Sequence, residues 1–348
     1  MKTYLINPEK ISMTNELFEE IELEDANTSK TINRLPDDPN FVYDIFIYRE
    51  YDIHPFPQRW PISKNTRLMV GALDSPFYDE FKEKAEMYFF DTFWLYESAR
   101  ELITDEYNTG SNELKFLFTV MINRSKVHRR ILMKELDNFG LLGDNSRYSF
   151  LNPIKNEFNV IWHKEGEQKF LPSQEWISEG YDYESPNWEW KPPVEIKQSL
   201  IQIVAETCNG DNNGTSDPTF VTEKTWIPLL LGIPFVVVAN QGFHEDLYKR
   251  FGIEMYDEII DYHFDSIPLM HHRIHTLVMQ INKLKNQNWE ELRKKVSEKV
   301  KRNQERVHKL IESGDGVPNI KTDKDFNKWV VEVAQDRVKK GGFIKKLV

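Results

Sequence analysis

Cysteine is nearly absent from this sequence: Cys208 is the one example among 348 residues. A single thiol cannot build a disulfide framework within the chain or supply a cysteine-based zinc cluster. Small disulfide-stapled domains and zinc-binding modules of that kind are therefore excluded. We expect a protein of a reducing, intracellular compartment.

Long apolar runs are missing as well. The longest, residues 229–239, is interrupted by Gly232 and Pro234, and it is shorter than the about 20 apolar residues that cross a bilayer. The first residues, Met1 to Ile6, lack the apolar core of a signal peptide. The sequence therefore predicts no membrane span and a cytoplasmic protein.

Glycine-rich phosphate signatures are also lacking. Neither the P-loop pattern nor the three-glycine dinucleotide-binding pattern occurs where a strand runs into a helix. Internal repeats are absent too, which excludes a repeat architecture. Any phosphate site in this chain must rely on charged side chains and helix starts instead.

Charge is unevenly distributed along the chain. Residues 281–348 carry a net charge of +8 and the remainder −19, which together give −11. An acidic body argues against a protein that coats nucleic acid. The basic segment still allows contact with an anionic partner, or it is a solvated helical face.

Apolar residues are plentiful, at 40% with 13% aromatic, and their pattern predicts strands alternating with helices. Residues 1–40 are acidic and polar, and we expect one short strand there followed by an irregular segment. Further strands are predicted at residues 41–48, 66–71, 114–121, 199–206 and 235–239. Helices are predicted at residues 77–85, in the segment that stops at Gly140, at 242–251, across 268–312 and at 322–340.

The polar stretch from Asn108 to Ser111 is the candidate linker between two halves of the chain. The length fits two domains of about 100–200 residues each. We predict an α/β fold with two Rossmann-like domains, residues 1–110 and 111–315, that face a central cleft. Residues 316–348 are predicted to hold a terminal helix that packs back on the first domain.

Basic residues follow the strand predicted at 114–121 and open the next helix. They are Arg124, Lys126, His128, Arg129 and Arg130. Backbone N–H groups and the helix dipole favour an anion at such a place, and arginine binds phosphate in a bidentate manner. The pattern predicts a phosphate-binding cluster; the alternative is an exposed basic helix start.

A second polar group follows the strand at 199–206. Glu206 ends that strand, and Thr222, Glu223 and Lys224 begin the next helix. A carboxylate accepts hydrogen bonds from ribose hydroxyls, and a neighbouring lysine attracts a diphosphate. We expect Glu223 and Lys224 to be exposed in the cleft, unless the segment is an ordinary helix cap.

The segment from Thr222 to Val237, with Thr-Glu-Lys-Thr-Trp followed by Gly-Ile-Pro-Phe, resembles the donor-binding motif of α1,3-fucosyltransferases. It is more similar still to a group of phage and viral glycosyltransferases. The segment from Asn123 to Arg129 and the one from Gly242 to Asp265 also resemble that group. The similarity covers roughly residues 114–150 and 198–285, about a third of the chain.

The resemblance implies a GT-B fold, with an acceptor domain at 1–110 and a donor domain at 111–315. It implies transfer of a sugar from a UDP- or GDP-sugar, with no further cofactor and no metal. Arg129 would bind phosphate, Glu223 the ribose and Lys224 the diphosphate. Glu206 and Thr222 are placed in the same donor site.

The catalytic base departs from the fucosyltransferase pattern. A Gly-Glu pair supplies the base in that family, but Gly71 is followed by Ala72 here. Asp74, two residues on, is the substitute candidate. The alternative is that Asp74 caps a helix, with Pro76 in the first turn.

The acceptor is left open by the sequence. The resemblance to phage enzymes points to 5-hydroxymethylpyrimidines in duplex DNA, which would place the protein in the host cytoplasm. A glycan or surface polysaccharide is the alternative acceptor. A non-catalytic nucleotide-binding module is a second alternative, because the Gly-Glu pair is missing.

Two other groups look like metal ligands but have simpler explanations. His271, His272 and His275 have helical spacing, which is typical of a solvated helix face. Asp323 and Asp325 precede the predicted terminal helix, where a cap is expected. We therefore predict no metal site.

Overall fold

The computed structural model describes the backbone of the strands before residue 90, and side chains as well as backbone at most of the described positions from Thr92 onward. The described residues are 2–6, 13–14, 17–18, 21–25, 28–32, 41–47, 66–70, 86–89, 92–102, 113–122, 126–150, 176–177, 194–206, 219–314 and Gln335.

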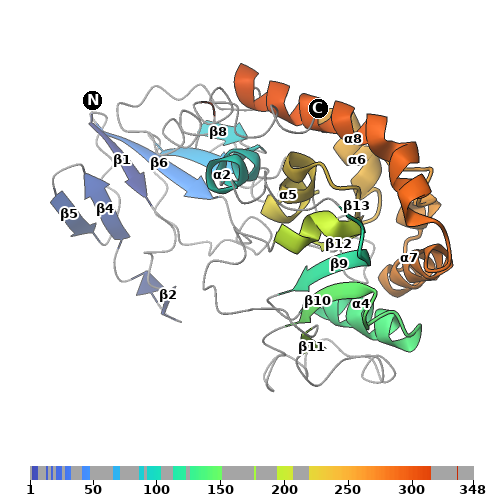
Figure 1. Ribbon diagram of the computed structural model, residues 1–348. Coiled ribbons are helices and arrows are strands. Elements are labelled where there is room, and N and C mark those ends of the chain that lie inside the picture. Colours follow the sequence, from blue (N-terminus) through green and yellow to red (C-terminus); the bar gives the residue numbers. More distant parts are fainter. Residues whose placement is uncertain are drawn as a thin grey trace.

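The second half of the chain contains an α/β unit with a sheet of order β11-β10-β9-β12-β13 (Figure 1). Four strands are parallel, and β11 pairs antiparallel with β10 at one edge. Their bounds are β9 Phe116–Ile122, β10 Ser146–Phe150, β11 Trp176–Ile177, β12 Ser199–Ala205 and β13 Phe235–Val238. Every residue of β12 and β13 is buried, as expected for parallel strands covered on both faces.

Helices connect and cover these strands. Their bounds are α2 Phe93–Glu101, α4 Val127–Asn138, α5 Glu223–Leu231, α6 Phe243–Phe251, α7 Met270–Leu284 and α8 Trp289–Ser313, with 3-10 turns η4 Val194–Gln198 and η5 Tyr262–Ser266. The predicted strands and helices of this half are confirmed wherever they fall among the described residues. None of the described helices is both long enough and apolar enough to cross a membrane.

The order of the strands reverses between β9 and β12. From β9 the chain crosses through α4 to β10 on one side, whereas from β12 it crosses through α5 to β13 on the other. Because such crossovers are right-handed, α4 and α5 cover opposite faces of the sheet. α4 packs with α7, and α5 packs with α2 and α8 (Figure 1). The carboxyl ends of β9 and β12 thus border the crevice where sheets of this kind bind ligands.

Gly232 ends α5 and sets the entry into β13. Its φ is 66°, in the left-handed region that favours glycine, and its N–H donates to the Leu229 carbonyl. A Cβ at this position would lie 2.7 Å from the side chain of Gln304 on α8. Since the end of the Gln304 side chain is flexible, it is the backbone conformation that requires glycine at the predicted Gly-Ile-Pro break.

The first half of the chain contains a second sheet, of order β5-β4-β1-β6-β7-β8. Strands β1, β6, β7 and β8 are parallel, and β4 and β5 add an antiparallel pair. A separate short pair, β2 and β3, lies within residues 13–18. The strand bounds are β1 Lys2–Ile6, β2 Met13–Thr14, β3 Leu17–Phe18, β4 Ile21–Asp25, β5 Thr28–Ile32, β6 Phe41–Ile47, β7 Thr66–Val70 and β8 Glu86–Phe89.

Our prediction for residues 1–40 was wrong after the first strand. The segment that we expected to be irregular contains β4 and β5. β5 lies at the sheet edge, and β4 pairs antiparallel with both β1 and β5, so a continuous apolar run is unnecessary in either strand. The helices predicted at 77–85 and 322–340 and the linker at 108–111 lie outside the described residues, apart from Gln335.

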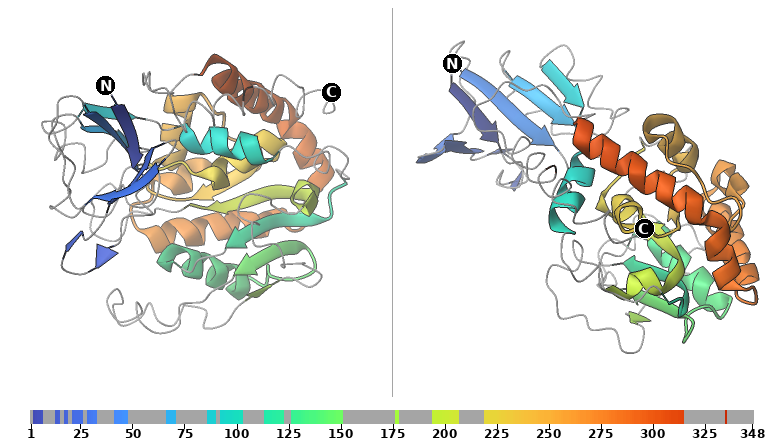
Figure 2. Two further views of the ribbon diagram at one scale, coloured as in Figure 1. Left: turned by 90° about the vertical axis from the view of Figure 1, so that its left-hand side faces the viewer. Right: turned by 45° about the horizontal axis from the view of Figure 1, so that its top comes forward.

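Helix α2 packs on the helices that cover the sheet of the second half of the chain. Tyr96 on α2 is fully buried, and its hydroxyl donates to the Leu310 carbonyl of α8 at 3.1 Å. Figure 2 shows α2 next to the carboxyl end of α8, on the side facing the sheet of the first half of the chain. The two halves therefore contact each other through α2.

Candidate functional site

Glu206 lies directly after β12, at the point where the strand order reverses. Its N–H donates to the Val238 carbonyl of β13 at 3.1 Å. Its own carbonyl accepts from His128 Nε2 at 2.8 Å and from Arg129 Nη2 at 3.1 Å. Since a carbonyl can only accept, Nε2 of His128 carries the proton. The first turn of α4 is thereby attached to the end of β12.

The carboxylate of Glu206 holds the start of α5. Oε1 accepts from the Thr222 N–H at 3.0 Å and from the Thr225 hydroxyl at 2.6 Å. Oε2 accepts from the Thr222 hydroxyl at 2.6 Å. The Thr222 oxygen in turn caps the helix by accepting from the Lys224 N–H at 3.4 Å. Glu206 is fully buried, and these bonds orient the side chains that begin α5.

Glu223 and Lys224 form an ion pair with each other at the start of α5. Glu223 is only 5% exposed, and the Lys224 side chain is 28% exposed. Our expectation that both side chains are exposed is therefore wrong for Glu223. The adjacent ammonium allows this carboxylate to be buried, because a buried charge needs a close partner.

Several cations lie near His128 at the carboxyl ends of the strands. The pKa of His128 lies well below its usual value, first because of burial and then because of Arg129, with Lys126 and Arg273 adding to the effect. The hydrogen bond to the Glu206 carbonyl offsets part of this shift. Arg273 reaches the same edge from α7, where it donates to the Ala239 carbonyl at 3.1 Å.

The basic helix start is not a solvated surface. Arg129 and Arg130 are only 3% and 4% exposed, and burial lowers the pKa of Arg130. This result excludes the alternative of an exposed basic helix start for those two residues. Lys126 precedes α4 and is half-buried. Buried cations near a helix start favour a bound anion or acceptor groups of the protein itself.

Several predicted site residues are therefore brought together: Lys126, Arg129, Glu206, Thr222, Glu223 and Lys224. Two predicted residues, Asp74 and Arg124, lie outside the described residues, as does the loop at 207–218. Sequence reasoning missed Thr225 and Arg273. Thr225 follows Thr222 by one helical turn, which is a usable signal, whereas Arg273 sits in an amphipathic helix with no local signal.

The histidines of α7 have different surroundings. His275 Nδ1 lies 2.7 Å from Glu135 Oε2 and ties α7 to α4, while His271 and His272 are exposed. Among the residues that the structure describes, no group of histidine, cysteine or carboxylate side chains is arranged to hold a metal ion. Asp323 and Asp325 lie outside that part of the chain.

Comparisons of the chain with protein-family models, with curated proteins and with solved structures found no match. A functional proposal therefore rests on the sequence and on the geometry at the ends of β9 and β12.

Proposed function

We propose that this protein is a glycosyltransferase that moves a sugar from a nucleotide-diphosphate donor to an acceptor hydroxyl. One observation carries the proposal: Glu206 joins the two polar segments that resemble a donor site. Its carbonyl binds His128 and Arg129, and its carboxylate positions Thr222 and the start of α5. Two helix starts and several cations thus meet at the crevice of a parallel sheet, a setting suited to a diphosphate.

In this proposal Arg129 and Lys224 balance the negative charge of the diphosphate. Glu223 accepts hydrogen bonds from the ribose hydroxyls. Because Glu223 is buried against Lys224, donor binding exchanges one partner for another: Lys224 turns to the phosphate and the ribose takes its place on Glu223. The ion pair therefore keeps both groups in position before the donor arrives.

The transfer step needs a base and a stabilised leaving group. The acceptor hydroxyl attacks the anomeric carbon, the bond from that carbon to the diphosphate oxygen breaks, and the hydroxyl proton passes to a carboxylate. Asp74 is the proposed base. The leaving diphosphate is stabilised by the cations and by the starts of α4 and α5, which are fixed before the reaction.

A GT-B arrangement is part of the same proposal. Two sheets with parallel strands, one in each half, are consistent with an acceptor domain at 1–110 and a donor domain at 111–315. Residues 316–348 would close the structure on the first domain. The proposed acceptor is 5-hydroxymethylpyrimidine in duplex DNA, with the basic segment at 281–348 contacting phosphates. A glycan is the alternative acceptor.

A donor screen tests the proposal. The full chain is incubated with UDP-glucose, UDP-galactose, UDP-N-acetylglucosamine, GDP-mannose or GDP-fucose, together with hydroxymethylated duplex DNA or an oligosaccharide. We expect release of UDP or GDP with one donor, at least about tenfold lower in Lys224→Ala because a charged contact to phosphate is lost. Lys249→Ala is the matched control, since Lys249 is exposed and lies on α6. Absence of nucleotide binding would refute the proposed site.

A non-catalytic nucleotide-binding module is the second candidate. Ala72 stands where the resembling fucosyltransferases have a glutamate, and this observation favours it. The same screen separates the two candidates. Binding of UDP or GDP that depends on Lys224, without turnover of any donor, would favour the module over the enzyme.

A further inference from the structure

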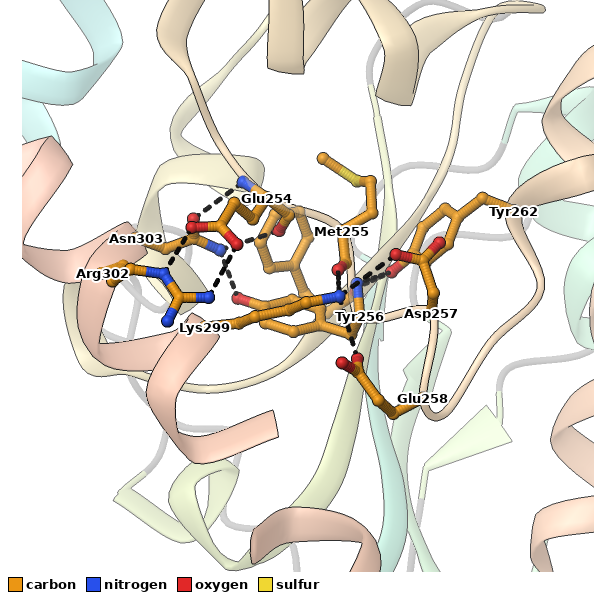
Figure 3. A network of polar contacts seen from close by, with 10 residues as sticks. Glu254, Met255, Tyr256, Asp257, Glu258, Tyr262, Lys299, Arg302 and Asn303 are labelled. Carbon is orange, nitrogen blue, oxygen red and sulfur yellow. Dashed lines mark hydrogen bonds and ion pairs between the residues drawn. The ribbon is translucent and has the colours of Figure 1, made fainter. Parts of the chain in front are cut away.

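A cavity of about 590 Å³ lies beside β13, on the outer side of this edge strand. It is bounded by α6, the segment at 252–261, η5 and α8. Its volume is within the range of small-molecule sites, about 300–1,000 Å³. Figure 3 shows part of its wall, where Met255, Asp257, Tyr262 and Lys299 converge in one polar network. None of these residues takes part in the proposed donor site.

Two hydrogen-bond donors on this wall, the Lys299 ammonium and the Tyr262 hydroxyl, are already engaged. Lys299 Nζ lies 2.8 Å from the Met255 carbonyl, 3.2 Å from Asp257 Oδ2 and 3.0 Å from Glu258 Oε2. These three acceptors account for all three N–H groups of the ammonium. The hydroxyl of Tyr262 donates to the Phe235 carbonyl at 3.1 Å. Lys299 therefore contributes charge to the cavity but no free donor.

His244 does not supply a positive charge. Its Nε2 accepts from the Val237 N–H at 3.0 Å, which requires an unprotonated Nε2. The imidazole is thus neutral, with its proton on Nδ1, which lies 3.2 Å from Asp265 Oδ2. The same carboxylate oxygen accepts from the His244 N–H at 2.9 Å.

Acceptors remain available in the cavity. Asp265 is 5% exposed, and no described donor reaches its Oδ1; the same is true of Oδ1 of Asp257. Asp257 shares Lys299 with Glu258, and Glu254 pairs with Arg302, whereas Asp265 lies beside the neutral His244. Arg273 attracts Asp265 from outside the cavity, where its guanidinium binds backbone carbonyls. The cavity therefore combines unused acceptors with excess negative charge.

An aromatic ring completes the site. Tyr248 on α6 lines the cavity and is 57% exposed, an unusual degree of exposure for a large ring. Tyrosine faces attract cations that lie over the ring. A neutral polyol would satisfy the acceptors but would leave the excess charge uncompensated.

We propose that this cavity binds a small organic cation that carries primary ammonium groups. Such a ligand brings the N–H donors that the wall lacks, neutralises the carboxylates and packs against Tyr248. The chemistry fits a linear polyamine or an amino sugar. The proposal does not depend on the proposed glycosyltransferase activity.

Calorimetric titration of the full chain tests the proposal with three probes at physiological ionic strength. Spermidine represents polyamines, D-glucosamine represents amino sugars, and D-glucose is the neutral analogue of the second. We expect saturable binding of spermidine or D-glucosamine and none of D-glucose. The probe that binds more tightly shows whether the cavity prefers a polyamine or an amino sugar. Equal binding of D-glucosamine and D-glucose, or no binding of either cation, would overturn the proposal.

Variants locate the binding. Asp257→Asn should weaken it roughly three- to fivefold, as expected for a partly exposed charge pair. Tyr248→Ala should weaken it about two- to fivefold through loss of the ring contact. Both positions are exposed, so the fold should be retained, and thermal unfolding checks this. Glu305→Gln on α8 is the matched control for lost charge. An equal loss in that control would show unspecific attraction to an acidic protein and would overturn the proposal.

Discussion

The carboxyl end of β12 and the cavity beside β13 use their polar groups in opposite ways. At β12, the carbonyl of Glu206 and both of its carboxylate oxygens accept from protein donors, and Arg129, Lys126 and Arg273 surround the site. In the cavity, the donors of Lys299 are engaged and carboxylate oxygens remain. The first arrangement favours an anion and the second a cation.

A count of charged residues does not distinguish the two sites. Both sites contain carboxylates and cations. At the end of β12, one such pair is formed by the sequence neighbours Glu223 and Lys224. What differs is which groups still have unused lone pairs or N–H groups after the fold has formed. Substitutions that release an engaged group therefore test the comparison directly.

The largest effect is expected for Glu206→Ala. Loss of the carboxylate leaves the Thr222 N–H and the hydroxyls of Thr222 and Thr225 without their acceptor in a buried place. We expect the free energy of unfolding to fall by about 3–5 kcal/mol, because several buried polar groups lose their partner. Denaturant unfolding measures this.

Glu206→Gln keeps the shape and one acceptor oxygen, so it should cost clearly less than Glu206→Ala. Nucleotide binding should weaken in both variants, because the start of α5 is no longer oriented. Equal stability of Glu206→Ala and the wild type would show that the carboxylate does not hold α5.

The next largest loss of stability is expected at the ion pair of Glu223 and Lys224. Lys224→Met leaves the Glu223 carboxylate buried without its neighbouring cation. We expect a loss of about 1–2 kcal/mol, below the range for fully buried pairs because Lys224 is partly exposed. Adding Glu223→Gln should restore part of that loss. Denaturant unfolding of the wild type, both single variants and the double variant completes the cycle, and strictly additive effects would contradict a coupled pair.

A pH effect of intermediate size is expected from His128. Its pKa is lowered in the folded protein, so below about pH 6.5 the unfolded chain takes up a proton that the folded protein does not. Stability is therefore lost as the pH falls from that value toward the lowered pKa, at up to about 1.4 kcal/mol per pH unit.

His128→Gln tests this expectation, since its amide N–H can still donate to the Glu206 carbonyl. Denaturant unfolding between neutral and mildly acidic pH should show a smaller loss of stability in this variant. The pKa of His308 on α8 is also lowered by burial, so it contributes a slope of the same sign. His308→Gln is therefore the comparison variant, and an unchanged slope in His128→Gln would exclude a neutral, buried His128.

Much of the second α/β unit was predictable because its local signals agree with its packing. The strands β9, β12 and β13 are mostly apolar since both faces are covered, and Gly140 and Gly232 end helices with positive φ. β10 was missed because Ser146–Phe150 mixes polar and aromatic residues, and its identity as a strand depends on pairing with β9.

The site was predictable as a location rather than as a set of contacts. The polar residues that follow the predicted strands indicated that Arg129, Glu206 and Lys224 lie at the carboxyl ends of strands in the second half. The hydrogen bonds of Glu206 depend on how the chain returns between residues 206 and 222, and the burial of Glu223 depends on the geometry of α5. Neither is specified by local sequence pattern.

The smallest change in stability is expected for a substitution in the cavity beside β13. Lys299→Met removes an ammonium that engages the Met255 carbonyl, Asp257 and Glu258, so these acceptors become available to a ligand. We expect spermidine affinity to rise about three- to tenfold, while stability falls by about 1 kcal/mol through lost hydrogen bonds. Calorimetric titration measures the affinity. Lys295→Met, at an exposed position on the same helix, gives the effect of net charge alone. If Lys299 itself bound the ligand, its removal would weaken binding, and the contrast between the two sites would be lost.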